Sequence, residues 1–169
     1  MQTHDTRPCR RAQSAPGTAR QRGFTMTELG VTLTIAAVLA TLAVPSFQGI
    51  IATQKARTYA SALYATLSKA RSEAITLNGN VTVQPKAGGW KNGWQILDVN
   101  NNVLDDYTAT SGVNVPTSPA TVIYSASGRM SAGATPTFKI NTVSGHTTNY
   151  QCVSVTPSGR PYMQAMQSC

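Results

Sequence analysis

The chain has 169 residues, a formal net charge of +8 and 41% hydrophobic residues. This length suits one domain with an appendage, and the composition excludes a disordered or collagen-like chain. Four of the eight net charges fall before Phe24, because five arginines and one aspartate occupy that stretch. The remaining +4 is too weak an excess to imply nucleic-acid binding without a localised basic patch.

A basic leader, residues 1–23, precedes an apolar run, residues 24–44, in which Glu28 is the only formal charge. As a helix, with a rise of about 1.5 Å per residue, this run is long enough to cross roughly 30 Å of hydrocarbon. A conventional secretory signal is cleaved after its apolar region, whereas the plausible site here, Gly23/Phe24, precedes it. The sequence therefore predicts a retained membrane helix with its leader in the cytoplasm and its C-terminal domain in the periplasm.

Residues 22–29, Arg-Gly-Phe-Thr-Met-Thr-Glu-Leu, resemble the processing site of type IV prepilins. The resemblance implies that a prepilin peptidase cleaves after Gly23 and methylates the new N-terminus, Phe24. The alternative is a plain single-pass anchor in the inner membrane. Glu28 would need a partner in an apolar fibre core, because an unpaired buried carboxylate costs several kcal/mol. The nearest candidate is the α-amine of a neighbouring Phe24, and that pairing would set the position of a subunit entering a fibre.

Pro45 ends the apolar half of the helix, residues 24–45, and predicts a kink or a locally melted turn. Beyond it, residues 46–78 have the periodicity of an amphipathic helix that ends at Asn78-Gly79. The apolar stripe, which we expect to pack on the C-terminal domain, consists of Ala56, Ala60, Leu63, Leu67, Ala70, Ala74 and Leu77.

From residue 79 onward, short β-type segments alternate with turn residues, and no second helix is expected. The expected strands are 81–83, 94–99, 122–125, 137–140, 150–156 and a short edge strand at 161–163, with a hairpin turn at 100–102 and a loop at 108–120. The predicted fold class is therefore α+β, with a long kinked N-terminal helix packed on an antiparallel sheet in a domain of residues 79–169.

Four further segments resemble the GspH/FimT family of pseudopilins and minor pilins, and most closely its FimU-like members: residues 70–75, 89–94, 123–129 and 155–160. The resemblance implies a type IV pilin-like fold and a subunit that joins the major pilin and other minor pilins in a pilus. Its role would be to prime assembly or to couple tip subunits to the main fibre. Two alternatives stay open: a pilus-borne DNA receptor for natural transformation, and a minor pseudopilin of a type II secretion system.

Some FimT-like proteins bind DNA through a C-terminal Gly-Arg-x-Arg motif, in which two arginines project from one side of a strand. This sequence has Gly159-Arg160-Pro161-Tyr162, so the second arginine is absent. A diffuse basic face would then be needed, and the candidates are Arg160, Arg129, Lys139, Lys86 and Lys91. The two Ser-Gly-Arg segments, 127–129 and 158–160, are interpreted as similar hairpin turns.

Cys152 and Cys169 are the two cysteines that remain after removal of a leader containing Cys9. Outside the cytosol they are expected to form a disulfide worth roughly 3 kcal/mol, with two free thiols as the alternative. A metal site is not expected, because the sequence has no CxxC. Catalysis and a cofactor are not expected either, and Asp105-Asp106 is interpreted as a solvated hairpin rather than an acid-base pair.

Overall fold

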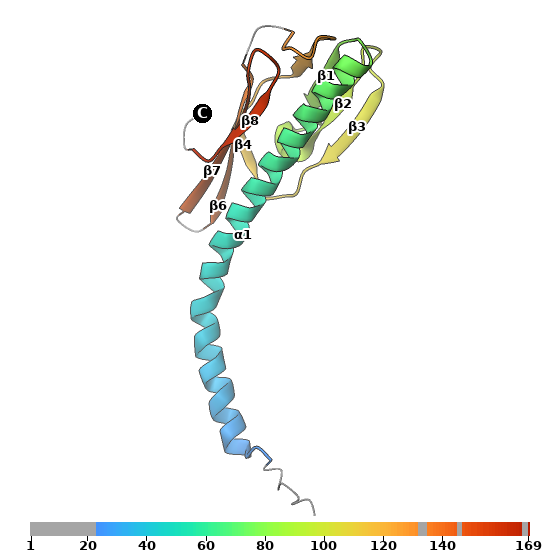
Figure 1. The fold of residues 1–169 in the computed structure, drawn as a ribbon. Helices are drawn as coiled ribbons and strands as arrows, with labels where there is room; N and C mark the ends of the chain where they lie inside the picture. The colour runs from blue at the N-terminus through green and yellow to red at the C-terminus, as the bar shows by residue number, and fades with distance from the viewer. Residues whose placement is uncertain (1–22, 132–134, 145–146, 167–168) are drawn as a thin grey trace, which may run out of the picture. The chain divides into compact units, whose positions relative to one another are not determined.

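The computed structural model describes residues 23–131, 135–144, 147–166 and 169, without the side chains of 42–46, 144 and 147. In this part of the chain a long helix, α1 (Met26–Thr76), precedes eight strands and a short 3-10 helix, η1 (Trp90–Asn92) (Figure 1). The chain divides into two compact units, residues 1–39 and 40–169, and all the strands belong to the second. Residues 1–22, which include all the arginines of the leader, lie outside the described residues.

The strands form two four-stranded antiparallel sheets. The first has the order β3-β2-β1-β5 and the second has the order β4-β6-β7-β8. Their bounds are β1 Val81–Pro85, β2 Gly93–Leu97, β3 Val103–Thr108, β4 Asn114–Thr117, β5 Val122–Tyr124, β6 Thr137–Ser144, β7 Thr147–Val155 and β8 Pro161–Gln164.

The α+β class is confirmed, and three details of the β domain differ from expectation. The strand β3, which follows the expected turn at 100–102, is not among the expected strands. The single sheet expected from the sequence is in fact two sheets. Residues 108–120 are not all loop, because β4 lies within them and pairs with β6. β4 is short and contains Pro116, and its pairing with β6 is irregular between Asn114 and Thr117. These properties weaken the sequence signal of a strand.

The core forms where the C-terminal half of α1 packs on the β domain. Six of the seven predicted stripe residues are buried, which confirms the packing face, whereas Leu77 is 49% exposed. Leu77 lies outside the stripe because α1 ends at Thr76. Asn78 takes a left-handed conformation with φ of 48°, and the Gly79 N–H donates to the Ala74 carbonyl at 3.2 Å. This is the usual way in which a helix C-terminus is closed.

α1 stays helical through Pro45, so the locally melted turn expected there is absent. The side chain of Pro45 lies outside the described residues, and a kink at this position stays a prediction. Among the residues that the structure describes, no helical stretch combines the length and the apolar character needed to cross a membrane. The last three residues of the predicted span 24–44 belong to the stretch 42–46, whose side chains are not described.

Candidate functional site

The N-terminal unit begins at a helix cap. Thr25 precedes the first helical residue, and its Oγ1 accepts a hydrogen bond from the backbone N–H of Glu28 at 3.2 Å. A threonine at the cap followed by glutamate three residues later is the capping-box sequence, which satisfies N–H groups that have no partner within the helix. The helix therefore has its own start signal directly after Gly23-Phe24. The spacing of Thr25 and Glu28 in the sequence carries this signal, which is not among the expectations above.

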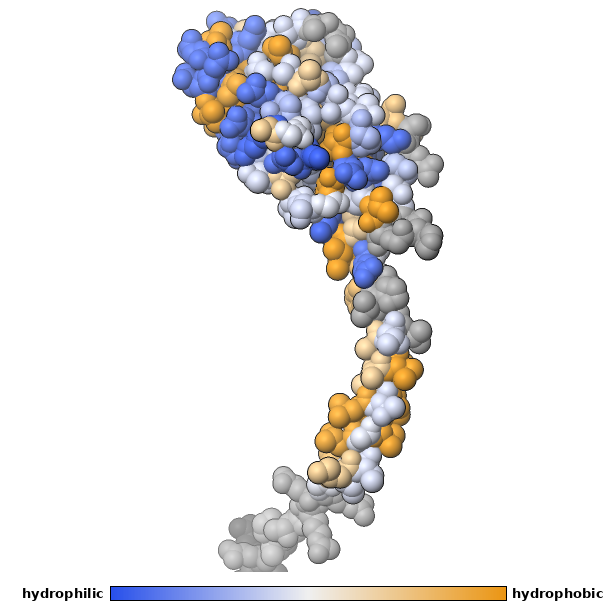
Figure 2. Space-filling view, turned by 180° about the vertical axis from the view of Figure 1, so that it is seen from behind, coloured by the Kyte–Doolittle hydropathy of each residue, from blue (hydrophilic) through white to orange (hydrophobic). Residues whose placement is uncertain are grey.

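The described side chains of this unit are exposed and largely apolar. Phe24 is 78% exposed and Met26 is 92% exposed, and the exposed hydrophobic residues that follow are Leu29, Val31, Leu33, Ile35, Val38 and Leu39. Figure 2 shows these hydrophobic side chains along the N-terminal part of α1. An apolar surface of this extent is typical of a segment that is covered by lipid or by other chains. Glu28 is exposed on the same segment.

Two tryptophans join α1 to both sheets. Trp94 on β2 stacks on Tyr107 with ring centroids 4.3 Å apart, and its Nε1–H donates to Thr66 Oγ1 of α1 at 2.9 Å. Trp90 packs edge-to-face on Phe138 of β6 at 4.7 Å, so it links the two sheets. The hydroxyl of Tyr59 on α1 donates to the Trp90 carbonyl at 2.6 Å. Burial raises the pKa of the Tyr59 phenol, so this group stays a neutral donor.

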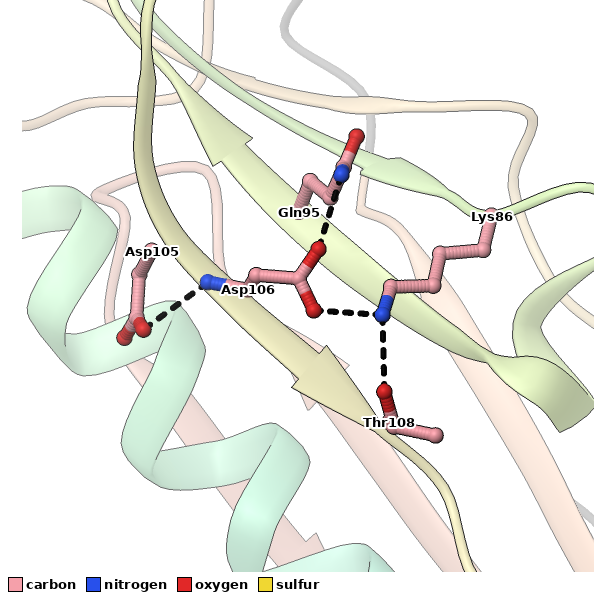
Figure 3. Close-up of polar contacts among 5 residues, drawn as sticks. All are labelled: Lys86, Gln95, Asp105, Asp106 and Thr108. Atoms are coloured by element: carbon pink, nitrogen blue, oxygen red, sulfur yellow. Dashed lines mark hydrogen bonds and ion pairs between the residues drawn. The ribbon is translucent and has the colours of Figure 1, made fainter.

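The adjacent residues Asp105 and Asp106 face opposite sides of β3. Asp105 accepts from Lys69 Nζ of α1 at 2.9 Å, whereas Asp106 accepts from Lys86 and from Gln95 Nε2, the latter at 2.8 Å (Figure 3). The hydrogen bond from its lysine is the main cause that lowers the pKa of each carboxyl group. Both residues lie in the second strand of the β2–β3 hairpin, and their side chains stay partly exposed, which agrees with the expected solvated hairpin. Because their carboxylates diverge, they do not form an acid-base pair.

The two Ser-Gly-Arg segments form turns with the same hydrogen bonds. In the first turn, residues 125–129, the Gly128 N–H donates to the Ser125 carbonyl at 2.8 Å. In the second turn, residues 156–160, the Gly159 N–H donates to the Thr156 carbonyl, also at 2.8 Å. Each turn also begins with a hydroxyl that contacts the serine hydroxyl two residues on, at 3.0 and 2.9 Å. The interpretation as two similar turns agrees with this geometry.

These turns pack directly against each other, and we refer to them as the paired turns. A side chain at Gly159 would overlap the carbonyl oxygen of Gly128, and its Cβ would lie 3.3 Å from Cα of Arg129. The Met130 N–H donates to the Pro157 carbonyl at 3.3 Å. The sequence repeat therefore marks two segments that are far apart in the chain and adjacent in the fold.

Arg71 connects α1 to the paired turns. Its Nε–H donates to the Gly128 carbonyl at 3.0 Å, and a Cβ at Gly128 would lie 3.3 Å from that Nε. The methyl end of Ile75 would overlap the same Cβ. Arg71 and Ile75 belong to the segment 70–75 that resembles the GspH/FimT family. This segment therefore contacts the first of the paired turns, at Gly128.

Cys152 and Cys169 form a disulfide with a Cα–Cα distance of 5.7 Å and a sequence separation of 17 residues. The bond attaches the C-terminal residue to β7, and the Cys169 sulfur lies 3.7 Å from the Phe138 carbonyl of β6. The C-terminal segment thus returns across the second sheet after β8.

The five cations proposed for DNA binding do not share one environment. Lys86 is bound to Asp106 and donates to Thr108 Oγ1 at 2.8 Å (Figure 3), and Lys139 lies 4.9 Å from the ring centroid of Tyr150. The side chains of Lys91, Arg129 and Arg160 are exposed. The structure brings only the last two together, through the paired turns.

No group of three or more metal-ligating side chains gathers in the described ranges. A cavity of about 220 Å³ lies between α1 and the segment 107–113, with Ile51, Tyr59, Tyr107 and Val113 among its walls. Its lining contains one cation, Lys55, and no carboxylate, histidine or cysteine.

A model of the family described as type II transport protein GspH matches residues 59–159, more than half of the chain. The minor pilin FimU of Pseudomonas aeruginosa PAO1 has a similar structure in one crystal form, with 21% identity, 69% of this chain and 96% of that chain covered, and a TM-score of 0.56. A second crystal form of FimU has 22% identity, coverage of 67% and 98%, and a TM-score of 0.55.

The minor pseudopilin EpsH of the Vibrio cholerae type 2 secretion system is also similar in structure, with 15% identity, coverage of 66% and 97%, and a TM-score of 0.51. At these identities the likeness to FimU and EpsH establishes a common fold. No curated protein sequence matches this chain significantly.

Proposed function

We propose that this chain, which belongs to the GspH family of type II transport proteins, is a minor subunit that primes a type IV pilus or couples its tip subunits to the main fibre. Membership of the family, together with the fold shared with a minor pilin and a minor pseudopilin, identifies a structural subunit and not an enzyme. The observation that carries the finer proposal is the capped, apolar and exposed N-terminal segment with its single carboxylate, attached to a pilin-like domain.

Processing at Gly23/Phe24 fits this proposal. Cleavage by a prepilin peptidase would remove the basic leader and leave the Thr25 cap intact, so the mature helix would still begin within two residues of its new N-terminus. The helix would first reside in the inner membrane, with the β domain in the periplasm, and would then transfer to the fibre. Methylation of the Phe24 amine would complete the processing.

Glu28 is the residue to which we assign the assembly step. A fibre of packed helices is a low-dielectric environment in which a lone carboxylate is unfavourable, and the amine of a neighbouring Phe24 would neutralise it. The test is Glu28→Ala in a strain that relies on this subunit, with Glu73→Ala, a half-buried carboxylate near the end of α1, as the control. We expect normal membrane insertion of both variants and loss of the Glu28 variant from sheared fibres. Equal incorporation of the two variants would reject the assigned role.

A type II secretion pseudopilus is the second candidate, because the family description names type II transport and EpsH has the same fold. Deletion of the gene distinguishes the two. Loss of surface pili with normal protein secretion supports the pilus, whereas retained pili with defective secretion supports the pseudopilus.

DNA reception has weaker physical support than either. Affinity for a duplex rises with the number of phosphates that a connected basic face contacts. Lys86 and Lys139 are engaged by an aspartate and by an aromatic ring, so the candidate face is reduced to Arg129, Arg160 and the separate Lys91.

A further inference from the structure

The paired turns hold two exposed arginines close together without a neutralising acid. Gly159 packs on the backbone of Arg129, and Arg160 follows directly. No contact joins either guanidinium to a carboxylate in the described part of the chain, where Asp105 and Asp106 are bound to lysines of other elements. Two exposed cations on adjoining turns make this surface positively charged, and an acidic partner would neutralise that charge.

The paired turns that carry these arginines are held in place by contacts with each other and with α1. The two turns are joined by backbone contacts, and the half-buried Arg71 holds the first one to α1 through the Gly128 carbonyl. The second turn leads into β8, whose first residue, Pro161, is buried and pairs with Val155 of β7. The surface is therefore preformed, so little binding free energy would be spent on ordering these turns when a partner binds.

β8 adds an exposed tyrosine, Tyr162, two residues after Arg160 and therefore on the same side of the chain. Tyr162 is 41% exposed on the edge strand of its sheet, whereas Met163 pairs with Val153 and faces the other side. Arginine and tyrosine are residue types enriched at the cores of protein interfaces. Pro161 lacks an N–H group and makes the edge a poor template for an added strand, so recognition here would occur through side chains.

We propose that Arg129, Arg160 and Tyr162 form a docking surface for an acidic segment of another subunit of the same filament, in which a carboxylate lies beside an apolar side chain. The carboxylate would bind the arginines, and the apolar group would pack on the tyrosine ring. Two arginines supply few phosphate contacts, which favours a protein partner over DNA. This inference rests on the proposed function, since it names the kind of partner through which the subunit would be coupled.

The test is site-specific photo-crosslinking of the full-length protein in its host, with p-benzoylphenylalanine in place of Tyr162. The matched control carries the same group in place of Gln95, which lies on the other sheet. We expect a crosslink from position 162 to a filament subunit, mapped by mass spectrometry to an acidic segment, and none from position 95. Arg129→Glu combined with Arg160→Glu should lower the crosslinked fraction at least tenfold, whereas Lys91→Glu should leave it unchanged.

Two results would overturn the proposal. The first is the absence of a crosslink to any filament subunit from a protein that is present in sheared fibres; this refutes the docking surface and leaves the proposed function standing. The second is that the detergent-solubilised full chain binds a 30-base-pair duplex and that the Arg129→Glu, Arg160→Glu double variant does not. This result would assign the surface to DNA. Absence of the wild-type protein from fibres, with pili and secretion unaffected by its deletion, would instead refute the proposed function.

Discussion

Gly159 is the position at which a single added methyl group should test the paired turns. Gly159 has φ of 81°, a conformation that costs an alanine about 1 to 2 kcal/mol. The new Cβ would also overlap the Gly128 carbonyl oxygen, which already accepts the Arg71 hydrogen bond. Moving that carbonyl away weakens a bond to a charged group, which contributes about 1.5 to 3 kcal/mol. We therefore expect Gly159→Ala to lower the free energy of unfolding by about 3 to 5 kcal/mol.

Gly89→Ala is the control. Gly89 has φ of 93° and ψ of −179°, a conformation essentially confined to glycine, and a Cβ there would meet no other atom within 4 Å. The substitution therefore carries a conformational cost alone, about 1 to 3 kcal/mol. A larger effect of Gly159→Ala reports the contact between the turns.

The assay is urea unfolding of a fragment that begins at Ser46, because all core residues lie between Ala52 and Val155. Fluorescence of Trp90 and Trp94, which are the two tryptophans of the chain and are both buried, reports the transition. Arg71→Met in the Gly159→Ala background should cost less than Arg71→Met alone, since both changes disturb the same carbonyl. Equal destabilisation by Gly159→Ala and Gly89→Ala, together with additive Arg71 effects, would refute the reasoning.

Three further outcomes are expected from the same fragment. Replacing Cys152 and Cys169 by serine should lower the free energy of unfolding by about 3 kcal/mol, as the loop-closure estimate gives for this separation, and a reductant should then have no further effect. Tyr59→Phe removes one of two donors to the Trp90 carbonyl, which keeps the Gly93 N–H, and should cost about 0.5 to 1.5 kcal/mol by urea unfolding, with no loss of the packed ring. Lys69 lowers the pKa of Asp105, so the stability that this ion pair contributes is fully present above the ordinary carboxyl pKa. That stability should be lost as the pH falls below about 3.8, and Asp105→Asn should flatten this part of the pH profile.

The helix and its packing face could be predicted because they depend on local chemistry. Alternating steps of three and four residues place Ala56, Leu63 and Ala70 on one side of a helix, and burial follows from that periodicity. The stripe was extended one turn too far, to Leu77, because the end of the helix is set by the left-handed residue Asn78 and not by hydrophobicity. The stop expected at Asn78-Gly79 is where the helix is closed, although its last helical residue, Thr76, lies two positions earlier.

The contacts between distant segments could not be predicted. Nothing near Ser158-Gly159-Arg160 in the sequence indicates that it packs on Gly128, since the two turns come from different sheets and meet only in the folded domain. The positions of Lys86 and Lys139 were missed for the same reason. A basic residue counts toward a binding surface only when its neighbours are known, and here one neighbour is Asp106 and the other is the ring of Tyr150.

The divergence of Asp105 and Asp106 has a consequence for the outer edge of the first sheet. β3 is an edge strand, and such a strand can slip against its neighbour or pair with the same strand of another molecule. A slip by one residue would exchange the two faces, turn Asp106 toward the helix and break both lysine pairs at once. The pairing irregularity between Ile96 and Leu97 further disrupts a flat edge. In a fibre that concentrates many β domains, two consecutive aspartates would keep this strand in its place and discourage aggregation through its free side.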